Sequence, residues 1–181
     1  MKVETIVRGI TAVAVAALMA VGASIVTVRA AGDRSETLIY AVYNGQNTAS
    51  ETFKTMKSAQ GSTGERIESY AIVSEDLKGK VRIRDQRKRD ASVGAILGGI
   101  IGLVGGPAGV AAGATAGGAV GYLTGNAVGI SRDKVESMKQ SLTPDSSALV
   151  VVLDDRWVQD VERDLNQAHA RAVIADQIAS K

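Results

Sequence analysis

Residues 148–153 read ALVVVL, and this run is the strongest strand signal in the chain. An apolar run of this length, rich in valine and bounded by turn residues, is typical of a buried strand. Four apolar residues then recur at helical spacing: Trp157, Val161, Leu165 and Ala168. Residues 172–178 (AVIADQI) return to a strand pattern. The C-terminal part of the chain therefore predicts a strand, a helix and a strand.

The same order is predicted earlier in the chain. Residues 38–44 (LIYAVYN) and 67–74 (IESYAIVS) read as two apolar strands. Between them, residues 48–60 predict a helix with Asn47 or Thr48 as its N-cap. The apolar face of this helix consists of Ala49, Phe53, Met56 and Ala59.

Two units of this kind predict an α+β fold, a ferredoxin-like split βαβ sandwich with two helices on one face of a four-stranded antiparallel sheet. The domain would comprise residues 35–77 and 144–181, and a fold of this class implies no chemistry by itself. The connection between the second and third core strands holds a long insertion. At its end, residues 131–143 predict a connecting helix. The apolar face of that helix consists of Val135, Met138 and Leu142.

Most of the insertion is residues 91–130, which hold no charged side chain. Glycines recur in it at helical spacing, and the candidates for helix packing are Gly94, Gly98, Gly102, Gly105, Gly109, Gly113, Gly117, Gly121, Gly125 and Gly129. Glycine is a poor helix former in water, but small residues at this spacing let helices pack closely within a bilayer. Pro107 should break the helix, so the pattern predicts a glycine-zipper-like membrane hairpin with arms near residues 91–104 and 108–130.

The glycine stripe drifts around its helix, because a step of four residues advances about 400°. A single straight partner helix cannot cover the resulting arc, so the pattern favours self-association into a homo-oligomer. Two other placements remain open. The hairpin could be buried inside a soluble oligomer, and its short first arm could be re-entrant or interfacial instead of spanning the bilayer.

A turn at residues 76–79 (DLKG) leads into a basic hairpin arm and linker over residues 78–90. Its basic residues are Lys78, Lys80, Arg82, Arg84, Arg87, Lys88 and Arg89. Basic residues beside an apolar segment stay on the cytoplasmic side and attract anionic lipid headgroups, so all seven are candidates for lipid contact. The alternative is a solvated hairpin arm. Nucleic acid is not expected as a partner, since no aromatic residues interleave with these charges.

The N-terminal segment, residues 1–34, carries a second membrane signal. Residues 9–28 hold no charge and are flanked by basic residues on both sides. A helix of this length spans roughly 30 Å, the thickness of a hydrocarbon core, which predicts a transmembrane anchor. A cleaved signal peptide is the alternative, because Val28-Arg29-Ala30 has the pattern of a cleavage site. Together with the basic arm, these features predict a membrane protein with its domain on the cytoplasmic side.

The sequence resembles a bacterial membrane-protein family of unknown function, DUF1269. The resemblance covers roughly residues 36–178, and two stretches are its most specific parts. They are GAILGGIIGLVGGPAGVAAGATAGGAVG at residues 94–121 and LTPDSSALVVVLDDRW at residues 142–157. The resemblance implies a ferredoxin-like domain with a glycine-rich membrane insertion and, for the whole protein, a bacterial inner membrane. It brings no established activity and no catalytic residues, and the N-terminal apolar segment is not part of the family pattern.

Candidate chemistry is sparse. The chain has no cysteine, which excludes disulfides and thiolate metal sites. Asp154 and Asp155 stand where a helix begins, so N-capping explains them better than metal binding. His169 stands near a helix end, where we expect a structural or capping role and not a general base. The glycines match no dinucleotide or phosphate-loop fingerprint. We therefore predict no enzyme activity, catalytic residue, metal, cofactor or small-molecule substrate.

These features favour a non-enzymatic integral membrane protein that self-associates through glycine-zipper helices, in a membrane-structural or stress-related role. The expected partners are a bilayer with anionic headgroups and further copies of the chain. The alternative is a membrane-tethered binding module, whose ferredoxin-like sheet recognises a ligand or a protein. The formal net charge of +2 does not imply a strongly charged partner for the molecule as a whole.

Overall fold

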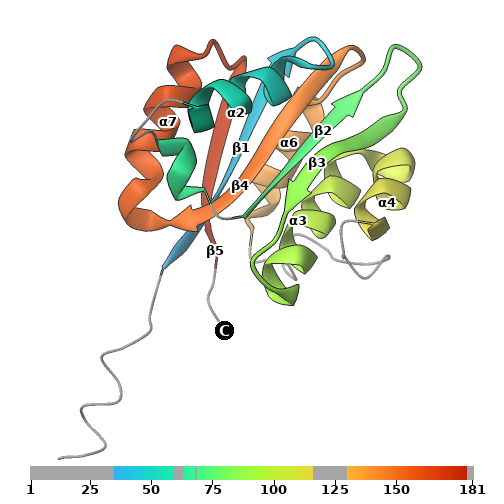
Figure 1. Ribbon diagram of the computed structural model, residues 1–181. Coiled ribbons are helices and arrows are strands. Elements are labelled where there is room, and N and C mark those ends of the chain that lie inside the picture. Colours follow the sequence, from blue (N-terminus) through green and yellow to red (C-terminus); the bar gives the residue numbers. More distant parts are fainter. Residues whose placement is uncertain (1–34, 59–62, 68, 116–129, 179–181) are drawn as a thin grey trace, which may run out of the picture. The chain divides into compact units, whose positions relative to one another are not determined.

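The computed structural model describes residues 35–58, 63–67, 69–115 and 130–178. They form a mixed α+β fold around an antiparallel sheet with the strand order β3-β2-β4-β1-β5 (Figure 1). The strands are β1 (Glu36–Asn44), β2 (Ser69–Glu75), β3 (Val81–Arg87), β4 (Ser146–Asp154) and β5 (Ala172–Ile178). The helices are α2 (Thr48–Ser58), α3 (Ala91–Val104), α4 (Gly106–Thr115), α6 (Arg132–Ser141) and α7 (Val158–Gln167), with short 3-10 helices η1 (Thr63–Arg66) and η2 (Asp155–Trp157).

Strand β4 lies in the middle of the sheet and pairs with β1 on one side and β2 on the other. In this register Val150 lies opposite Tyr40 of β1 and Ala71 of β2. Residues 146–153 are all buried, so the prediction of a buried strand at residues 148–153 is confirmed. Strands β1 and β2 are also buried along almost their whole length. Strands of this kind need cover on both faces of the sheet.

Helices α2 and α7 cover one face of the sheet (Figure 1). The core beneath them includes Ile39, Phe53, Ile72, Leu149, Val151, Val161 and Leu165. The backbone N–H of Ala49, in the first turn of α2, donates a hydrogen bond to Ser147 Oγ of β4 (3.0 Å). This bond fixes the start of α2 on the central strand. Ala49 lies on the apolar face predicted for α2, whereas Ala59 lies outside the described residues.

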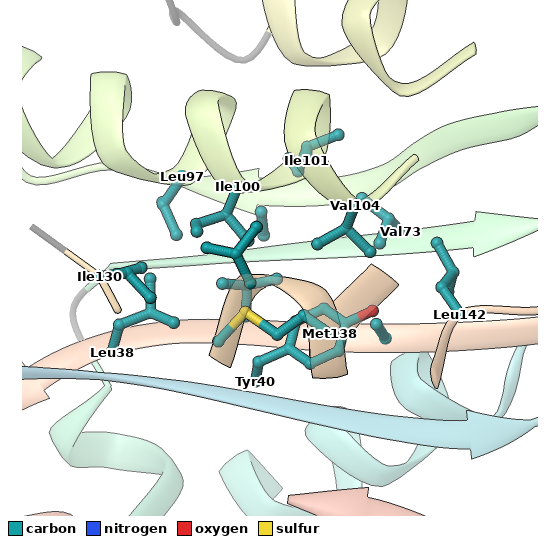
Figure 2. Packing of buried hydrophobic residues seen from close by; sticks show 14 of the residues in the cluster. Leu38, Tyr40, Val73, Leu97, Ile100, Ile101, Val104, Ile130, Met138 and Leu142 are labelled. Carbon is teal, nitrogen blue, oxygen red and sulfur yellow. The ribbon is translucent and has the colours of Figure 1, made fainter. Parts of the chain in front are cut away.

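Helices α3 and α6 cover the opposite face, and α4 packs against α3. Figure 2 shows the core between them and the sheet. Its labelled residues are Leu38, Tyr40, Val73, Leu97, Ile100, Ile101, Val104, Ile130, Met138 and Leu142. The expectation of a four-stranded sheet with helices on one face only is therefore wrong. Because β1, β2 and β4 bury side chains on both sides, the glycine-rich helix α3 supplies the second layer.

Strand β3 is additional to the four strands expected from the sequence, and it forms an edge of the sheet beside β2. It lies within the basic hairpin arm and linker predicted over residues 78–90. A β-bulge interrupts its pairing, since Ile72 lies opposite Asp85 but Val73 lies opposite Ile83. Arg84 is the extra residue of this bulge, which locally bends and twists the edge of the sheet.

The glycine-rich segment forms two helices within the described residues. Helix α3 has the bounds predicted for the first arm, and it begins where Asp90 Oδ1 accepts a hydrogen bond from Val93 N (2.9 Å). The break after it lies at Gly105 and Gly106, and not at the proline as expected. Gly106 has a φ of +57°, which glycine adopts without steric strain. Pro107 stands in the first turn of α4, where a missing N–H breaks no helical hydrogen bond.

No helix within the described residues is long and apolar enough to cross a bilayer. The predicted N-terminal anchor and its alternative, a cleaved signal peptide, fall on residues 1–34 and lie outside the described residues. Most of the second glycine arm, residues 116–129, lies outside them as well. The connecting helix is α6, and Val135 and Met138 on its predicted apolar face are buried.

Buried tyrosines of β1 predict a loss of stability at alkaline pH. Burial raises the pKa of Tyr43 from 10.0 to about 12. Above pH 10 an unfolded tyrosine loses its proton while the folded one keeps it, so the full stability exists below pH 10 and falls as the pH rises. We expect the contribution of Tyr43 to lower the free energy of unfolding by about 1.4 kcal/mol for each pH unit between about pH 10 and 12. Urea unfolding of the wild type and Tyr43→Phe, at about pH 8 and pH 11, measures this difference; equal losses in both proteins would contradict it.

Candidate functional site

Helices α3 and α4 lie side by side, and glycines of α4 set their separation. A Cβ atom at Gly109 would come closer than 3.0 Å to the carbonyl oxygen of Ile101. At Gly113 it would come equally close to the carbonyl oxygen of Gly98, and it would lie 3.0 Å from Gly102 N. Real Cβ atoms essentially never approach other atoms within 3.0 Å. The two helices therefore meet backbone to backbone, at a distance that only glycine permits.

The other predicted packing glycines differ in their surroundings. Gly94 and Gly98 are buried, and Gly102 and Gly105 are half-buried. A Cβ at Gly105 would lie 3.0 Å from Val81 Cγ2, so the α3–α4 corner packs on strand β3. Gly117, Gly121, Gly125 and Gly129 lie outside the described residues. The close contacts that the structure describes are all within one chain, and self-association through the glycine stripe stays a prediction.

The other side of α4 faces outward. Pro107, Val110 and Ala111 are exposed, and the exposed fraction of Val110 is 40%. Helix α4 contains no charged residue, so this surface is wholly apolar or small. Figure 1 shows α4 next to β3, and the two elements are in contact. An apolar helix surface thus lies along the edge of the sheet that carries the basic run.

Strand β3 displays three of the predicted basic residues, and all three are exposed. The Arg82 guanidinium lies 3.8 Å from Asp76, and Arg84 Nε donates a hydrogen bond to Ser74 Oγ (2.7 Å). Arg87 lies opposite Tyr70 in the register of β2 and β3. The exposed Arg82–Asp76 ion pair contributes little stability. Arg82 is therefore available to an anionic surface, and Arg84 and Arg87 are exposed on the same strand.

Arg89 differs from the other basic residues, because its side chain and backbone together connect three parts of the fold. Its guanidinium donates to Glu36 Oε1 at 2.6 Å and to Asp90 Oδ2 at 3.2 Å. Its backbone N–H donates to Ser69 Oγ (3.1 Å). The hydrogen bond to Glu36, and then the one to Asp90, raise the pKa of Arg89. The start of α3 is thereby tied to the first residues of β1 and β2. The guanidinium of Arg89 is therefore engaged within the fold, which the run of basic residues in the sequence does not reveal.

Lys78 and Lys80 are exposed on the turn between β2 and β3, which Asp76 closes. Asp76 Oδ1 accepts hydrogen bonds from Lys78 N at 2.9 Å and Lys80 N at 3.0 Å. Gly79 completes the turn with a φ of +75°, and its N–H donates to the Asp76 carbonyl (2.9 Å). The bond from Lys80 N, followed by that from Lys78 N, keeps the pKa of the Asp76 carboxyl below its usual value. The predicted turn at residues 76–79 is confirmed.

The family model described as a protein of unknown function, DUF1269, matches residues 91–181. The chain belongs to the DUF1269 family. The match begins at the first residue of α3 and extends through β5, so it includes the glycine helices and the central strand β4. Comparison with curated proteins and with solved structures gives no match.

Membership of DUF1269 supplies no chemistry, so the polar clusters have to be judged by their geometry. Asp154 caps η2, accepting a hydrogen bond from Arg156 N (3.2 Å), and its carboxylate also pairs with the Arg156 guanidinium (2.6 Å). Asp155 accepts hydrogen bonds from Thr37 Oγ1 (2.5 Å) and Gln177 Nε2 (3.2 Å). The capping role predicted for this pair is confirmed for Asp154, whereas Asp155 joins η2 to β1 and β5. No group of three or more potential metal ligands occurs within the described residues.

His169 follows the last turn of α7. Its φ is +58°, and its backbone N–H donates a hydrogen bond to the carbonyl of Asn166 (3.0 Å). A residue in the left-handed conformation just after a helix commonly ends that helix, and histidine tolerates the conformation better than most residues. The prediction that His169 lies at a helix end is therefore confirmed. A contact that sequence reasoning missed is the Arg66 guanidinium stacked 3.8 Å from the Trp157 ring centroid, which joins η1 to η2.

Proposed function

We propose that this DUF1269 protein is a non-enzymatic membrane protein with a ferredoxin-like core, and that its basic edge contacts anionic lipid. The basic edge consists of Lys78, Lys80, Arg82, Arg84 and Arg87, together with the outward surface of α4. The strand order β5-β1-β4-β2, with α2 and α7 on one face, supports the ferredoxin-like assignment. Strand β3 and the helices α3, α4 and α6 are additions to that core.

The observation that carries this proposal is the position of α4 beside β3. Helix α4 turns an uncharged surface with Val110 outward beside one face of β3, and the exposed arginines of β3 lie on the other face of the same edge strand, near Ser74 and Tyr70. A bilayer that meets this edge of the sheet would touch both surfaces, because apolar groups enter the interface while cations bind headgroups. The neighbouring corner at Gly105 holds α4 against Val81, which keeps the two parts together.

In this proposal α3 remains on the sheet and α4 is the helix that meets lipid. The predicted N-terminal anchor would hold the domain at a bacterial inner membrane, with the basic edge on the cytoplasmic side. Copies of the chain would associate through the later glycines, beyond α4. We do not favour recognition of a ligand by the sheet, because α2 and α7 cover one of its faces and α3 and α6 cover the other.

Flotation with lipid vesicles tests the proposal. The variant without residues 1–34 retains the compact unit of residues 35–181 and removes the predicted anchor. We expect it to float with vesicles of phosphatidylcholine and phosphatidylglycerol, and to float poorly with phosphatidylcholine alone. Replacing Lys80 and Arg87 with glutamine should weaken binding about thirtyfold at low salt, at about 1 kcal/mol for each lost basic residue.

The matched control is Lys139→Gln with Arg163→Gln, which removes the same charge from α6 and α7. Both residues are exposed and form only surface ion pairs, so their loss should alter folding little. If the control pair weakens binding as much as the β3 pair, net charge and not the basic edge attracts the protein. Absence of flotation with either type of vesicle would refute the proposed lipid contact.

A further inference from the structure

The tip of the β2–β3 turn exposes a large apolar side chain. The exposed fraction of Leu77 is 76%, and within the described residues Leu77 and Val110 are the exposed large hydrophobic residues. Both belong to elements at the β3 edge of the sheet, as Figure 1 shows for the β2–β3 turn and α4. An exposed leucine is common on protein surfaces, so its meaning depends on what surrounds it.

Leu77 borders a hollow whose other lining residues are charged or polar, although most of its exposed lining surface is apolar. The hollow has a volume of about 460 Å³, and its lining consists of Gln46, Asp76, Leu77, Lys78, Lys80 and Arg82. The three cations could oppose an anion, and Asp76 offsets only part of their charge. The Asp76 carboxylate already accepts two backbone hydrogen bonds of the turn and lies 3.8 Å from Arg82. The hollow therefore keeps a positive balance beside an apolar tip.

The turn holds this arrangement without help from a ligand. Asp76 N donates to the Lys80 carbonyl (3.1 Å), which closes the turn in addition to the two bonds to the Asp76 side chain. On the neighbouring loop, Gln46 Nε2 donates to Asp145 Oδ1 (3.1 Å), so the Gln46 side chain in the lining is held as well. A site that is formed in advance loses less conformational entropy on binding.

We propose that the β2–β3 turn is a lipid-headgroup site, in which the hollow receives the phosphate of an anionic lipid while Leu77 enters the boundary of the acyl chains. This inference rests on the proposed lipid contact and assigns it a specific place. A bilayer fits better than an acidic protein, because a lipid offers a phosphate and an apolar layer at adjacent depths. Lys78, Lys80 and Arg82 match the first, and Leu77 matches the second.

Site-specific fluorescence can test the inference in the full chain. The protein has no cysteine, so a single introduced cysteine can be labelled with the environment-sensitive dye NBD without competing sites. We would place it by Leu77→Cys at the turn, by Val110→Cys on α4, and by Gln167→Cys at the exposed end of α7 as the control. Each labelled protein is reconstituted into vesicles of phosphatidylcholine with and without phosphatidylglycerol. Circular dichroism checks that each variant is folded.

We expect the dye at position 77 to shift to the blue and gain intensity in vesicles with phosphatidylglycerol, and to be quenched by spin labels on acyl chains. The dye at position 167 should remain in water. Adding Lys78→Gln to the protein labelled at position 77 should lower, about fivefold, the ratio of molecules whose turn contacts lipid to molecules whose turn is in water. This factor corresponds to about 1 kcal/mol for one basic residue.

Other outcomes overturn the inference in distinguishable ways. A response at position 110 without one at position 77 would leave the proposed lipid contact intact and exclude the turn. No response at either position would contradict both. Equal responses in vesicles of phosphatidylcholine alone would mean that the turn needs no anionic headgroup, which contradicts the proposed headgroup site. A response of the same size to soluble glycerol phosphate would indicate a site for small phosphates, and one to polyglutamate would indicate an acidic protein partner.

Discussion

Replacing Gly113 with alanine is expected to lower the free energy of unfolding by about 2 kcal/mol, although alanine is the better helix former. The new Cβ would come closer than 3.0 Å to the carbonyl oxygen of Gly98, and it would lie 3.3 Å from the Cα of Gly102. Both are backbone atoms of α3, so no side chain can turn aside and the two helices must separate. Urea unfolding of residues 35–181, followed by circular dichroism, measures the change.

Gly102→Ala is the matched control for this substitution. It lies in the same hairpin, but the nearest atom to its new Cβ is the Cα of Val110 at 3.8 Å, an ordinary contact distance. We expect this variant to gain up to about 1 kcal/mol from helix propensity alone. The two alanine substitutions should therefore have opposite signs. A gain in both would mean that α4 does not rest on the backbone of α3.

The strands and helices could be predicted from sequence where a local signal marks each end. Helix α3 occupies residues 91–104 as predicted, because Asp90 caps its start and Gly105 follows its last residue. Strand β5 has the predicted bounds, residues 172–178. A short apolar run begins there soon after His169, whose backbone is in the left-handed conformation, and it is followed by the polar C-terminal residues of the chain. Hydrogen bonds and backbone conformation at such boundaries depend on a few neighbouring residues, which the sequence displays directly.

The partner of the glycine helices was harder to predict. A helix that is apolar on all sides gives no direction for its buried face, so the same pattern suits a bilayer or a sheet. A signal was nonetheless present in the strands. Residues 38–44 and 148–153 are apolar without alternation, and strands of this kind are covered on both faces. That pattern required a second layer of helices, and α3 and α6 were the available ones.

The candidate lipid surface was predictable in part. Basic residues are recognisable by type, but sequence does not reveal that Arg89 pairs with Glu36, which is 53 residues away in the chain. Sequence also gave no reason to single out Leu77, because one leucine in a turn has no periodic pattern. Its significance comes from the Asp76-centred turn and the cations around the hollow, which only the folded arrangement brings together.

Replacing Ile100 with alanine should be the most costly of these changes, at about 3 kcal/mol of unfolding free energy. Ile100 has an exposed fraction of 0% and lies in the core between α3 and the sheet. Figure 2 shows Ile100 near Met138 of α6, on the side of α3 that faces Tyr40 of β1. Truncation leaves a cavity where α3, α6 and one face of the sheet meet. Urea unfolding of residues 35–181 measures the loss, and Val110→Ala on the outward side of α4 should alter the same quantity by less than about 0.5 kcal/mol.

The same pair of variants separates two ways in which the hairpin could meet a bilayer. If α3 stays on the sheet and only α4 touches lipid, Ile100→Ala should remain equally destabilising when anionic vesicles are present. If the whole hairpin leaves the sheet for the bilayer, the side chain at position 100 is surrounded by lipid in the wild type and in the variant. Ile100→Ala should then lower the free energy of unfolding little in the vesicle-bound state. The proposed function requires the first result. The second would mean that α3 leaves the sheet, and it would replace lipid contact along the basic edge with insertion of the complete glycine hairpin.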